Sequence, residues 1–236
     1  MSIFSSTTLA CPNCGTANAF EEVESVNADR RADFRRAILA GSFQRQPCTA
    51  CGAPFRLDSD LLYIELKRRH WICARPVTAF DEWERHEAEA RDLFEQSYGT
   101  GAPAIVRELA GETKPRLVFG WPALREKLIA AEAGLDDAVL ELLKMQTLRQ
   151  LKEMPFAADS TPRLLGTAKD GALVMGWVAN PDDVTTHVKA VPRALYDAIA
   201  ADLADLASSR WGPVRAAFDD ALFVDVDRLM LAHATA

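Results

Sequence analysis

Two closely spaced cysteine pairs constrain this sequence more than any other feature. The first lies in CPNCG at residues 11–15 and the second in CTACG at residues 48–52. Two intervening residues allow both sulfurs of a pair to face one ion, and a glycine after each pair suits the positive φ with which a chain leaves such a turn. Four thiolates from two turns favour a tetrahedral metal site, with zinc as the preferred ion.

Other interpretations use the same cysteines. A redox C-x-x-C normally occurs once, beside a β-α-β pattern, whereas here it occurs twice, flanked by short strand-like runs. An odd total of five cysteines without an export signal does not fit a disulfide framework. An iron–sulfur cluster or a rubredoxin-like iron also uses four cysteines, so the metal stays open between zinc and iron.

The expected metal site is structural. A catalytic zinc usually has three protein ligands and keeps one position for water, whereas four cysteines close the coordination shell. Cys73 follows Trp71 and Ile72 in an apolar run, which indicates a buried core residue rather than a fifth ligand. No catalytic residue and no residue for a further cofactor is assigned. The predicted ligands of the structural zinc are Cys11, Cys14, Cys48 and Cys51.

A small β domain is expected around the cysteines, over residues 1–78. Its first strands are expected at 7–10, 17–26, 42–47 and 53–57. A helix from Asp29 to Gly41 accounts for the length of the chain between the two pairs. Apolar runs at 61–66 and 70–76 predict a hairpin with an exposed basic turn at 67–69. The domain is therefore interpreted as zinc-ribbon-like, with an inserted helix.

The apolar periodicity changes to that of helices after residue 78. Helices are expected at 79–98, 102–109, 121–133, 135–151, 195–209, 213–222 and 225–231. Strands are expected at 116–119, 163–168, 172–179 and 185–191. Asp136 is expected to cap the helix that follows it, and Asp170-Gly171 predicts a hairpin turn. The expected class is α+β, with a helical segment at 79–154 and a small C-terminal α+β segment at 155–236.

The net charge of −7 is unevenly distributed, because residues 1–80 carry +2 and residues 81–236 carry −9. An acidic second half argues against extended contact with nucleic-acid phosphates. A nucleic-acid-binding ribbon is the alternative, and it requires the basic side chains of the first domain to form one face. Those side chains are Arg30, Arg31, Arg35, Arg36 and the turn Lys67–Arg69.

Motifs for catalysis are missing from the sequence. It contains no G-x-x-x-x-G-K-[ST], no G-x-G-x-x-G after a strand and no G-x-S-x-G. Adjacent carboxylates at 136–137, 182–183 and 219–220 fit helix caps or solvated faces better than acid–base chemistry. An enzyme in the C-terminal half is a further alternative. It predicts a concave pocket with carboxylates of shifted pKa near residues 160–230.

Five stretches of the chain carry a resemblance to a known family. They read CPNCG, SVNADRRADFRRAILAGSFQ, CTACG, DLLYIELKRRHWICARP and LVFGWPALREKLIAAEAGLDDAVLELLKMQ. Together they span roughly residues 8–150 and resemble the CpXC family of bacteria and archaea. The resemblance implies metal-binding cysteines, at the same four positions, and no reaction. The second turn lacks the proline of the first, which leaves metal binding unaffected because proline is not a ligand.

The sequence thus favours a non-enzymatic protein with a structural zinc that acts as a scaffold or protein-interaction adaptor. No apolar run long enough for a membrane span and no secretory signal is found, so a cytoplasmic location without a membrane partner is expected. Apolar faces at 61–64, 71–73 and along the helices predict a protein partner or a homo-oligomer. Nucleic acid is a less favoured partner.

Overall fold

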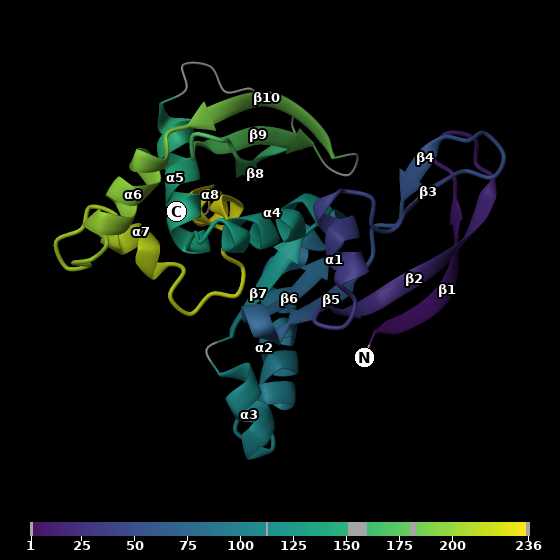
Figure 1. Ribbon diagram of the computed structural model, residues 1–236, viewed down its shortest axis with the longest axis horizontal. Coiled ribbons are helices and arrows are strands. Elements are labelled where there is room, and N and C mark those ends of the chain that lie inside the picture. The colour runs from purple at the N-terminus through teal and green to yellow at the C-terminus, as the bar shows by residue number, and fades with distance from the viewer. Residues whose placement is uncertain (1, 112, 151–159, 180–182, 235–236) are drawn as a thin grey trace. The chain divides into compact units, whose positions relative to one another are not determined.

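The computed structural model describes residues 2–111, 113–150, 160–179 and 183–234 (Figure 1). They fall into two compact units, Met1–Trp121 and Pro122–Ala236. The expected α+β class is confirmed, since an N-terminal β region carries the cysteines and helices with a second sheet follow. The expected domain boundaries, after residue 78 and after residue 154, stay a prediction. None of the described helices combines the length and apolar character that a transmembrane span needs.

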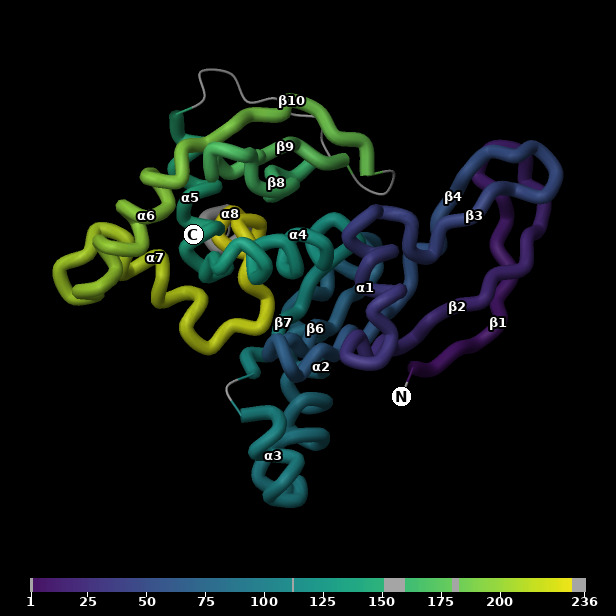
Figure 2. The backbone as a smooth tube through the Cα atoms, in the orientation of Figure 1, coloured from purple at the N-terminus to yellow at the C-terminus, as the bar shows by residue number. Residues whose placement is uncertain are grey.

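A five-stranded sheet forms the framework of the first unit, in the order β1-β2-β5-β6-β7. Its strands are β1 (Ile3–Ala10), β2 (Ala17–Asn27), β5 (Leu61–Glu65), β6 (His70–Arg75) and β7 (Lys114–Phe119). The β1–β2 and β5–β6 pairs are antiparallel hairpins, whereas β2–β5 and β6–β7 are parallel. Only residues 25–27 of β2 pair with β5. The far end of the β1–β2 hairpin therefore extends beyond the sheet, and its turn carries the first cysteine pair (Figure 2).

The predicted insert between the cysteine pairs is present as α1 (Ala32–Leu39). It begins three residues later than expected, because the Asp29 carboxylate accepts a hydrogen bond from the Leu66 backbone N–H at 3.0 Å instead of capping the helix. Gly41 follows the helix with φ 70°, as a glycine at this position is expected to do. The strands β3 (Arg45–Pro47) and β4 (Pro54–Arg56) then flank the second cysteine pair.

The helix expected at 79–98 packs on the sheet. It consists of a 3₁₀ turn at Val77–Glu82 followed by α2 (Trp83–Tyr98), and α3 (Ala104–Ala110) comes next. Phe94 of α2 meets the fully buried Trp71 of β6 edge-to-face, with ring centroids 5.2 Å apart. Phe80 meets Phe119 of β7 in the same manner at 5.4 Å. Edge-to-face pairs of this kind add to the apolar burial that holds the helix on the sheet.

The basic turn between β5 and β6 is exposed, as predicted, and contains a 3₁₀ helix at Leu66–Arg68. Replacing Lys67, Arg68 and Arg69 together by Ala is expected to change the melting temperature by less than about 5 °C. The reason is that Arg68 is itself largely exposed, and the buried carboxylate of Glu65 keeps Arg35 as a partner when Arg68 is removed. An ion pair with an exposed partner of this kind contributes about 1 kcal/mol or less. Differential scanning calorimetry measures this. Unfolding of the triple variant at room temperature would show that these side chains are structural.

The second unit packs helices against a three-stranded antiparallel sheet in the order β10-β9-β8. Its elements are α4 (Trp121–Glu132), α5 (Asp137–Arg149), β8 (Ser160–Thr167), β9 (Leu173–Ala179), β10 (Val184–Val191), α6 (Arg193–Asp202), α7 (Gly212–Ala216) and α8 (Val226–Ala234). Asp136 caps α5 as predicted, accepting hydrogen bonds from the N–H groups of Ala138 and Val139. The hairpin at Asp170-Gly171 is also confirmed, with Gly171 at φ 84°.

Two helices of the second unit are shorter than their patterns predict. The helix expected at 195–209 ends at Asp202, and the one expected at 213–222 ends at Ala216. In the first case Ser209 donates its hydroxyl hydrogen to Asp202 at 2.5 Å, and Ser208 donates to Asp205 at 2.7 Å. Ser and Asp side chains offer such local partners, which favour turns over the continued helix.

Charged side chains lie inside the core of the second unit. Lys144 of α5 is fully buried and places Nζ 2.7 Å from Glu126 Oε2 and 2.9 Å from Glu141 Oε2. Arg163 of β8 continues the network, reaching Glu126 at 3.1 Å and Asp225 at 2.5 Å. Burial opposes the charge on Asp225, but attraction to Arg163 outweighs it and lowers the pKa of this carboxyl to about 2.

Backbone groups complete the network. The N–H of Val226 donates to Glu141 Oε2 at 2.9 Å, and the N–H of Leu164 donates to Glu126 Oε1 at 2.5 Å. The carboxylates therefore join α4 and α5 to β8 and to the start of α8, which are separated by up to 85 residues in the sequence. Buried charges are tolerated only when they are paired and hydrogen-bonded, as they are here.

Candidate metal centre

The first cysteine turn closes at the end of the β1–β2 hairpin. The N–H of Gly15 donates to the Cys11 carbonyl at 2.8 Å, and the N–H of Cys11 donates to the Thr16 carbonyl at 2.9 Å. Gly15 has φ 74°, and a Cβ built there would meet no atom within 4 Å. The glycine is therefore required by backbone conformation and not by lack of space.

The second turn repeats this geometry between β3 and β4. The N–H of Gly52 donates to the Cys48 carbonyl at 3.0 Å, the N–H of Cys48 donates to the Ala53 carbonyl at 2.9 Å, and Gly52 has φ 71°. The proline of the first turn has no counterpart here, and the fold of the turn is the same without it. Both turns thus direct two sulfurs each to one side of the loop.

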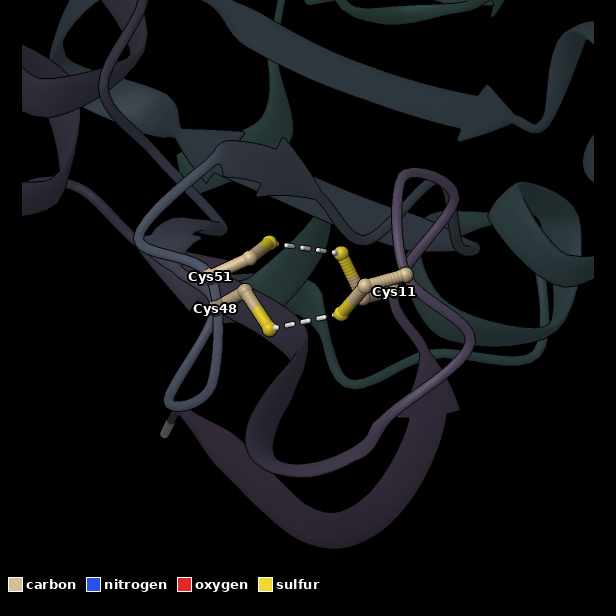
Figure 3. A group of neighbouring side chains, drawn as sticks. Cys11, Cys48 and Cys51 are labelled. Atoms are coloured by element: carbon tan, nitrogen blue, oxygen red, sulfur yellow. Dashed lines mark hydrogen bonds between the residues drawn. The ribbon is translucent and has the colours of Figure 1, made fainter.

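The four sulfurs converge on one point. The Sγ atoms of Cys11, Cys14, Cys48 and Cys51 all lie within 4.8 Å of one another. The pairs across the two turns are closer, at 3.8 Å for Cys11–Cys51 and 3.6 Å for Cys14–Cys48 (Figure 3). A tetrahedron with metal–sulfur bonds of about 2.3 Å has sulfur–sulfur edges of about 3.8 Å. The cluster therefore has the dimensions of a single tetrahedral ion bound by four thiolates.

These distances separate the alternatives that the sequence left open. A disulfide requires sulfurs about 2.05 Å apart, and all five cysteines are free. A multi-iron cluster places its own iron and sulfide atoms between the cysteines and holds them farther apart than a single ion does. The geometry thus suits one zinc or one rubredoxin-like iron.

Hydrogen bonds to the sulfurs favour the thiolate form in the second turn. Backbone N–H groups of Cys51 and Ala50 lower the pKa of Cys48 to about 6, and the Asn13 side chain lowers that of Cys51. Burial acts in the opposite direction on Cys11 and raises its pKa to about 11. A cation in the cluster would offset this penalty, because metal coordination favours the deprotonated thiol.

Asn18 is a supporting residue that the sequence analysis missed. It is 2% exposed and donates Nδ2–H to Cys48 Sγ at 3.5 Å and to the Thr16 carbonyl at 2.7 Å. Its Oδ1 accepts from the backbone N–H and hydroxyl of Thr49 at 2.8 and 2.9 Å. One side chain of β2 therefore fixes the second turn against the first. The only signal in the sequence is a polar residue at an inward position of a strand.

The apolar support for this cluster is small. Cys11 and Cys48 are buried together with Phe20, Phe55 and Leu57, and Phe20 meets Phe55 edge-to-face at 5.2 Å. Cys14 and Cys51 are exposed. Two of the five residues in this hydrophobic cluster are thus cysteines. The sulfurs therefore form part of its buried core.

Cys73 lies apart from the cluster, as the sequence predicts. It is 4% exposed in β6, and burial raises the pKa of its thiol to about 11. A buried thiol of this kind behaves as a small apolar side chain.

The basic side chains of the first unit are partly neutralised by acids. Arg35 of α1 and Arg68 of the turn both contact the buried Glu65, at 3.2 and 2.9 Å. Arg31 pairs with Asp33 at 2.7 Å. Basic side chains of the helix and of the turn therefore do come together, but they do so around the shared carboxylate of Glu65. Arg30, Arg36, Lys67 and Arg69 are exposed, and the nucleic-acid interface they would form stays a prediction.

Several of the adjacent carboxylates of the second unit have structural partners. Asp136 caps α5, Asp137 contacts Lys127 at 3.0 Å and Asp219 contacts Arg215 at 2.6 Å. Asp182 lies outside the described residues. Carboxylates with shifted pKa do occur, because burial raises the pKa of Asp227 to about 6. Asp227 borders the buried charge network, 3.9 Å from Arg163, and no carboxylate is among the described residues that line the pocket beside Gln146, Arg149 and Trp211.

Comparison with known proteins supports the resemblance found in the sequence. A family model described as CpXC protein matches residues 9–144, which include both cysteine turns, α1 and most of α5. No curated protein and no solved structure matches the chain. The family model covers more than half of the sequence and contains all four cysteines of the cluster, and the chain therefore belongs to the CpXC family.

Proposed function

We propose that Cys11, Cys14, Cys48 and Cys51 hold one zinc ion with a structural role. The observation that carries this proposal is the convergence of four sulfurs within 4.8 Å, with edges that match a tetrahedral four-thiolate site. Four protein ligands leave no position for a water or a substrate. The ion would join the turn of the β1–β2 hairpin to the loop between β3 and β4.

The size of the surrounding structure explains why a metal is needed there. β3 and β4 have three residues each, and among the described residues the hydrophobic cluster around the sulfurs contains three buried apolar side chains besides the cysteines. Such a segment buries too little apolar surface to be stable alone. Structural zinc supplies an apparent stabilisation of about 10–16 kcal/mol in small zinc domains.

Elemental analysis of the purified protein tests the metal proposal. One zinc per chain is expected, with four thiols protected from a thiol reagent until a chelator is added. Iron in place of zinc would show that the same four cysteines hold a different ion. A metal-free protein with both cysteine pairs oxidised to disulfides would contradict the proposal.

We further propose that the chain is a non-enzymatic, cytoplasmic adaptor that binds another protein or a second copy of itself through α2 and α3. Support comes from apolar side chains that these helices leave in solvent, namely Ile105 at 63%, Leu109 at 61% and Leu93 at 38% exposure. The reducing cytoplasm would keep the four thiols available for metal. The net charge of −7 favours a basic or apolar protein surface over nucleic acid.

Light scattering at micromolar concentration tests the homo-oligomeric form of this proposal. The wild type is expected to dimerise, and Ile105→Glu with Leu109→Glu is expected to give a folded monomer. Val188→Glu is the matched control, because Val188 is 60% exposed but lies in β10. A wild-type monomer at every concentration would contradict self-association. An unchanged dimer in the double variant would exclude these helices as the interface.

A further inference from the structure

A pocket of about 370 Å³ opens in the second unit, where the C-terminal end of α5 meets the segment leading into α7. Its volume lies within the range of sites for small molecules. The metal centre lies in the other unit. The described residues that line it are Gln146, Arg149, Gln150, Arg210, Trp211 and Val214.

Two of the arginines that line this pocket have no acidic partner among the described residues. Arg149 and Arg210 are exposed, and neither forms an ion pair with an acid in the part of the chain that the structure describes. Neighbouring arginines differ, because Arg193 pairs with Asp197 and Arg215 pairs with Asp219. The Arg210 guanidinium lies over the Trp211 ring, 5.3 Å from its centroid, which positions it beside the pocket.

Two of the residues that line the pocket carry buried polar atoms without a hydrogen-bond partner among the described residues. Trp211 is 5% exposed, and its indole Nε1–H has no acceptor among the described residues. The Oε1 atom of Gln146 is buried and has no donor there. Buried polar groups are nearly always paired with protein, water or ligand. An unpaired donor and an unpaired acceptor in two residues that line one pocket therefore point to a bound molecule that pairs with both.

The backbone at Trp211 is held by local contacts. Its backbone N–H donates to Ser209 Oγ at 3.0 Å, and Ser209 in turn donates to Asp202 at 2.5 Å. The next residue is Gly212, where a Cβ would lie 2.5 Å from the Leu206 carbonyl oxygen. The close approach of these two backbone segments requires glycine at this position. These contacts fix the backbone that carries Trp211, which lowers the entropic cost of binding a ligand beside it.

We propose that this pocket binds a small organic oxyanion, a carboxylate or a phosphate, that also carries a hydroxyl or amino group. Arg149, Arg210 and the indole N–H of Trp211 supply donors for the anionic oxygens. Guanidinium groups suit this role because they form charge-assisted hydrogen bonds to carboxylate and phosphate. Gln146 Oε1 accepts a hydrogen bond from the hydroxyl or amine, which selects against simple inorganic anions.

The indole N–H signals of the ¹⁵N-labelled protein give a direct readout. The chain has five tryptophans, and the Trp211 signal is assigned as the one that is lost in Trp211→Phe. Ribose 5-phosphate and malate are the probes for the phosphate and carboxylate forms of the ligand, with inorganic phosphate and uncharged ribose as comparisons. A saturable shift of the Trp211 signal is expected with at least one of the two organic anions. Ribose is expected to have no effect, and inorganic phosphate a weaker one.

Three variants separate a binding role from a structural one. Arg149→Gln with Arg210→Gln is expected to weaken binding of the effective probe by about tenfold or more, through loss of charge-assisted hydrogen bonds. Arg215→Gln is the control, because Arg215 lies in α7 and is paired with Asp219. Trp211→Phe is expected to stay folded, with some loss of stability because Phe is smaller than this 5% exposed core side chain. It lacks the indole signal, so its binding is followed by calorimetry, and it is expected to bind more weakly.

Two outcomes would overturn the proposal. One is the absence of any shift of the Trp211 signal with either organic anion at about 10 mM, a concentration that reveals even weak binding. The other is a shift that persists unchanged after both arginines have been replaced.

Discussion

Replacing Cys48 by Ser is expected to release the metal and to unfold residues 45–57 together with the turn at residues 11–15. Cys48 is 3% exposed, and its sulfur lies 3.6 Å from Cys14 Sγ at the centre of the cluster. A serine hydroxyl is a poor ligand for zinc, so the site loses a ligand and most of its affinity. Zinc content by elemental analysis and backbone hydrogen exchange measure the two effects.

The effect is expected to be large because little else holds this segment. Structural zinc contributes an apparent 10–16 kcal/mol or so, against a total stability of about 5–15 kcal/mol for a typical domain. Hydrogen exchange is expected to lose protection in β3 and β4, while β5, β6 and the second unit keep theirs. The five-stranded sheet and α2 have apolar contacts of their own, such as that of Trp71 with Phe94.

Cys73→Ala is the matched control for this variant. Cys73 is also a buried cysteine of the first unit, but it lies in β6 and is not part of the cluster. It is expected to keep one metal per chain and the protection of β3 and β4. Normal protection of these strands in metal-free Cys48→Ser would show that the metal is dispensable for the fold.

Replacing Lys144 by Met is expected to destabilise the second unit by about 3–5 kcal/mol. Lys144 is fully buried between Glu126 and Glu141. Its removal therefore leaves these two buried carboxylates without the cation that pairs with both. Met fills a similar volume, and the loss therefore reports on charge rather than on a cavity. Urea denaturation, followed through hydrogen exchange of the α5 amides, measures the change.

Lys189→Met is the control for this experiment, because Lys189 is exposed in β10 of the same unit and its replacement is expected to have little effect. Adding Glu141→Gln to Lys144→Met is expected to recover part of the lost stability. The amide removes one of the stranded charges and can still accept the hydrogen bond from Val226. A Lys144→Met variant within 1 kcal/mol or so of wild type would contradict the role assigned to the network.

The metal centre was the part of the structure most accessible to sequence reasoning. A cysteine pair with a following glycine describes a complete local turn, because the ligands, the spacing and the positive φ all lie within five residues. Asp136 and the Asp170-Gly171 hairpin were predictable for the same reason. Each of these features depends on neighbours in the sequence.

The charge network could not be found in this way. Glu126, Glu141 and Lys144 are spaced like solvent-facing residues of two helices, and their partners Arg163 and Asp225 come from distant segments. Only the fold shows that α5 is buried along its length from Ala138 to Met145. Periodicity assumes one polar face on each helix, and this helix has its charged residues in the core.

The parallel pairing of β2 with β5 and of β6 with β7 was likewise not predicted. An apolar run indicates a strand but not its partner, because pairing across a sheet is decided by non-local packing. The shortened helix α6 shows a related effect, since Ser209 and Asp202 form a local hydrogen bond that the apolar pattern does not reveal.

X-ray absorption of the purified protein at the zinc edge tests the central claim most directly. The four-thiolate site predicts a single shell of four sulfur atoms at about 2.3 Å from zinc, with no nitrogen or oxygen ligand. The sulfur–sulfur separations of 3.6 and 3.8 Å in the structure require that shell to be tetrahedral. A zinc bound mainly by oxygen or nitrogen, or a protein whose four cysteines carry no metal, would contradict the account.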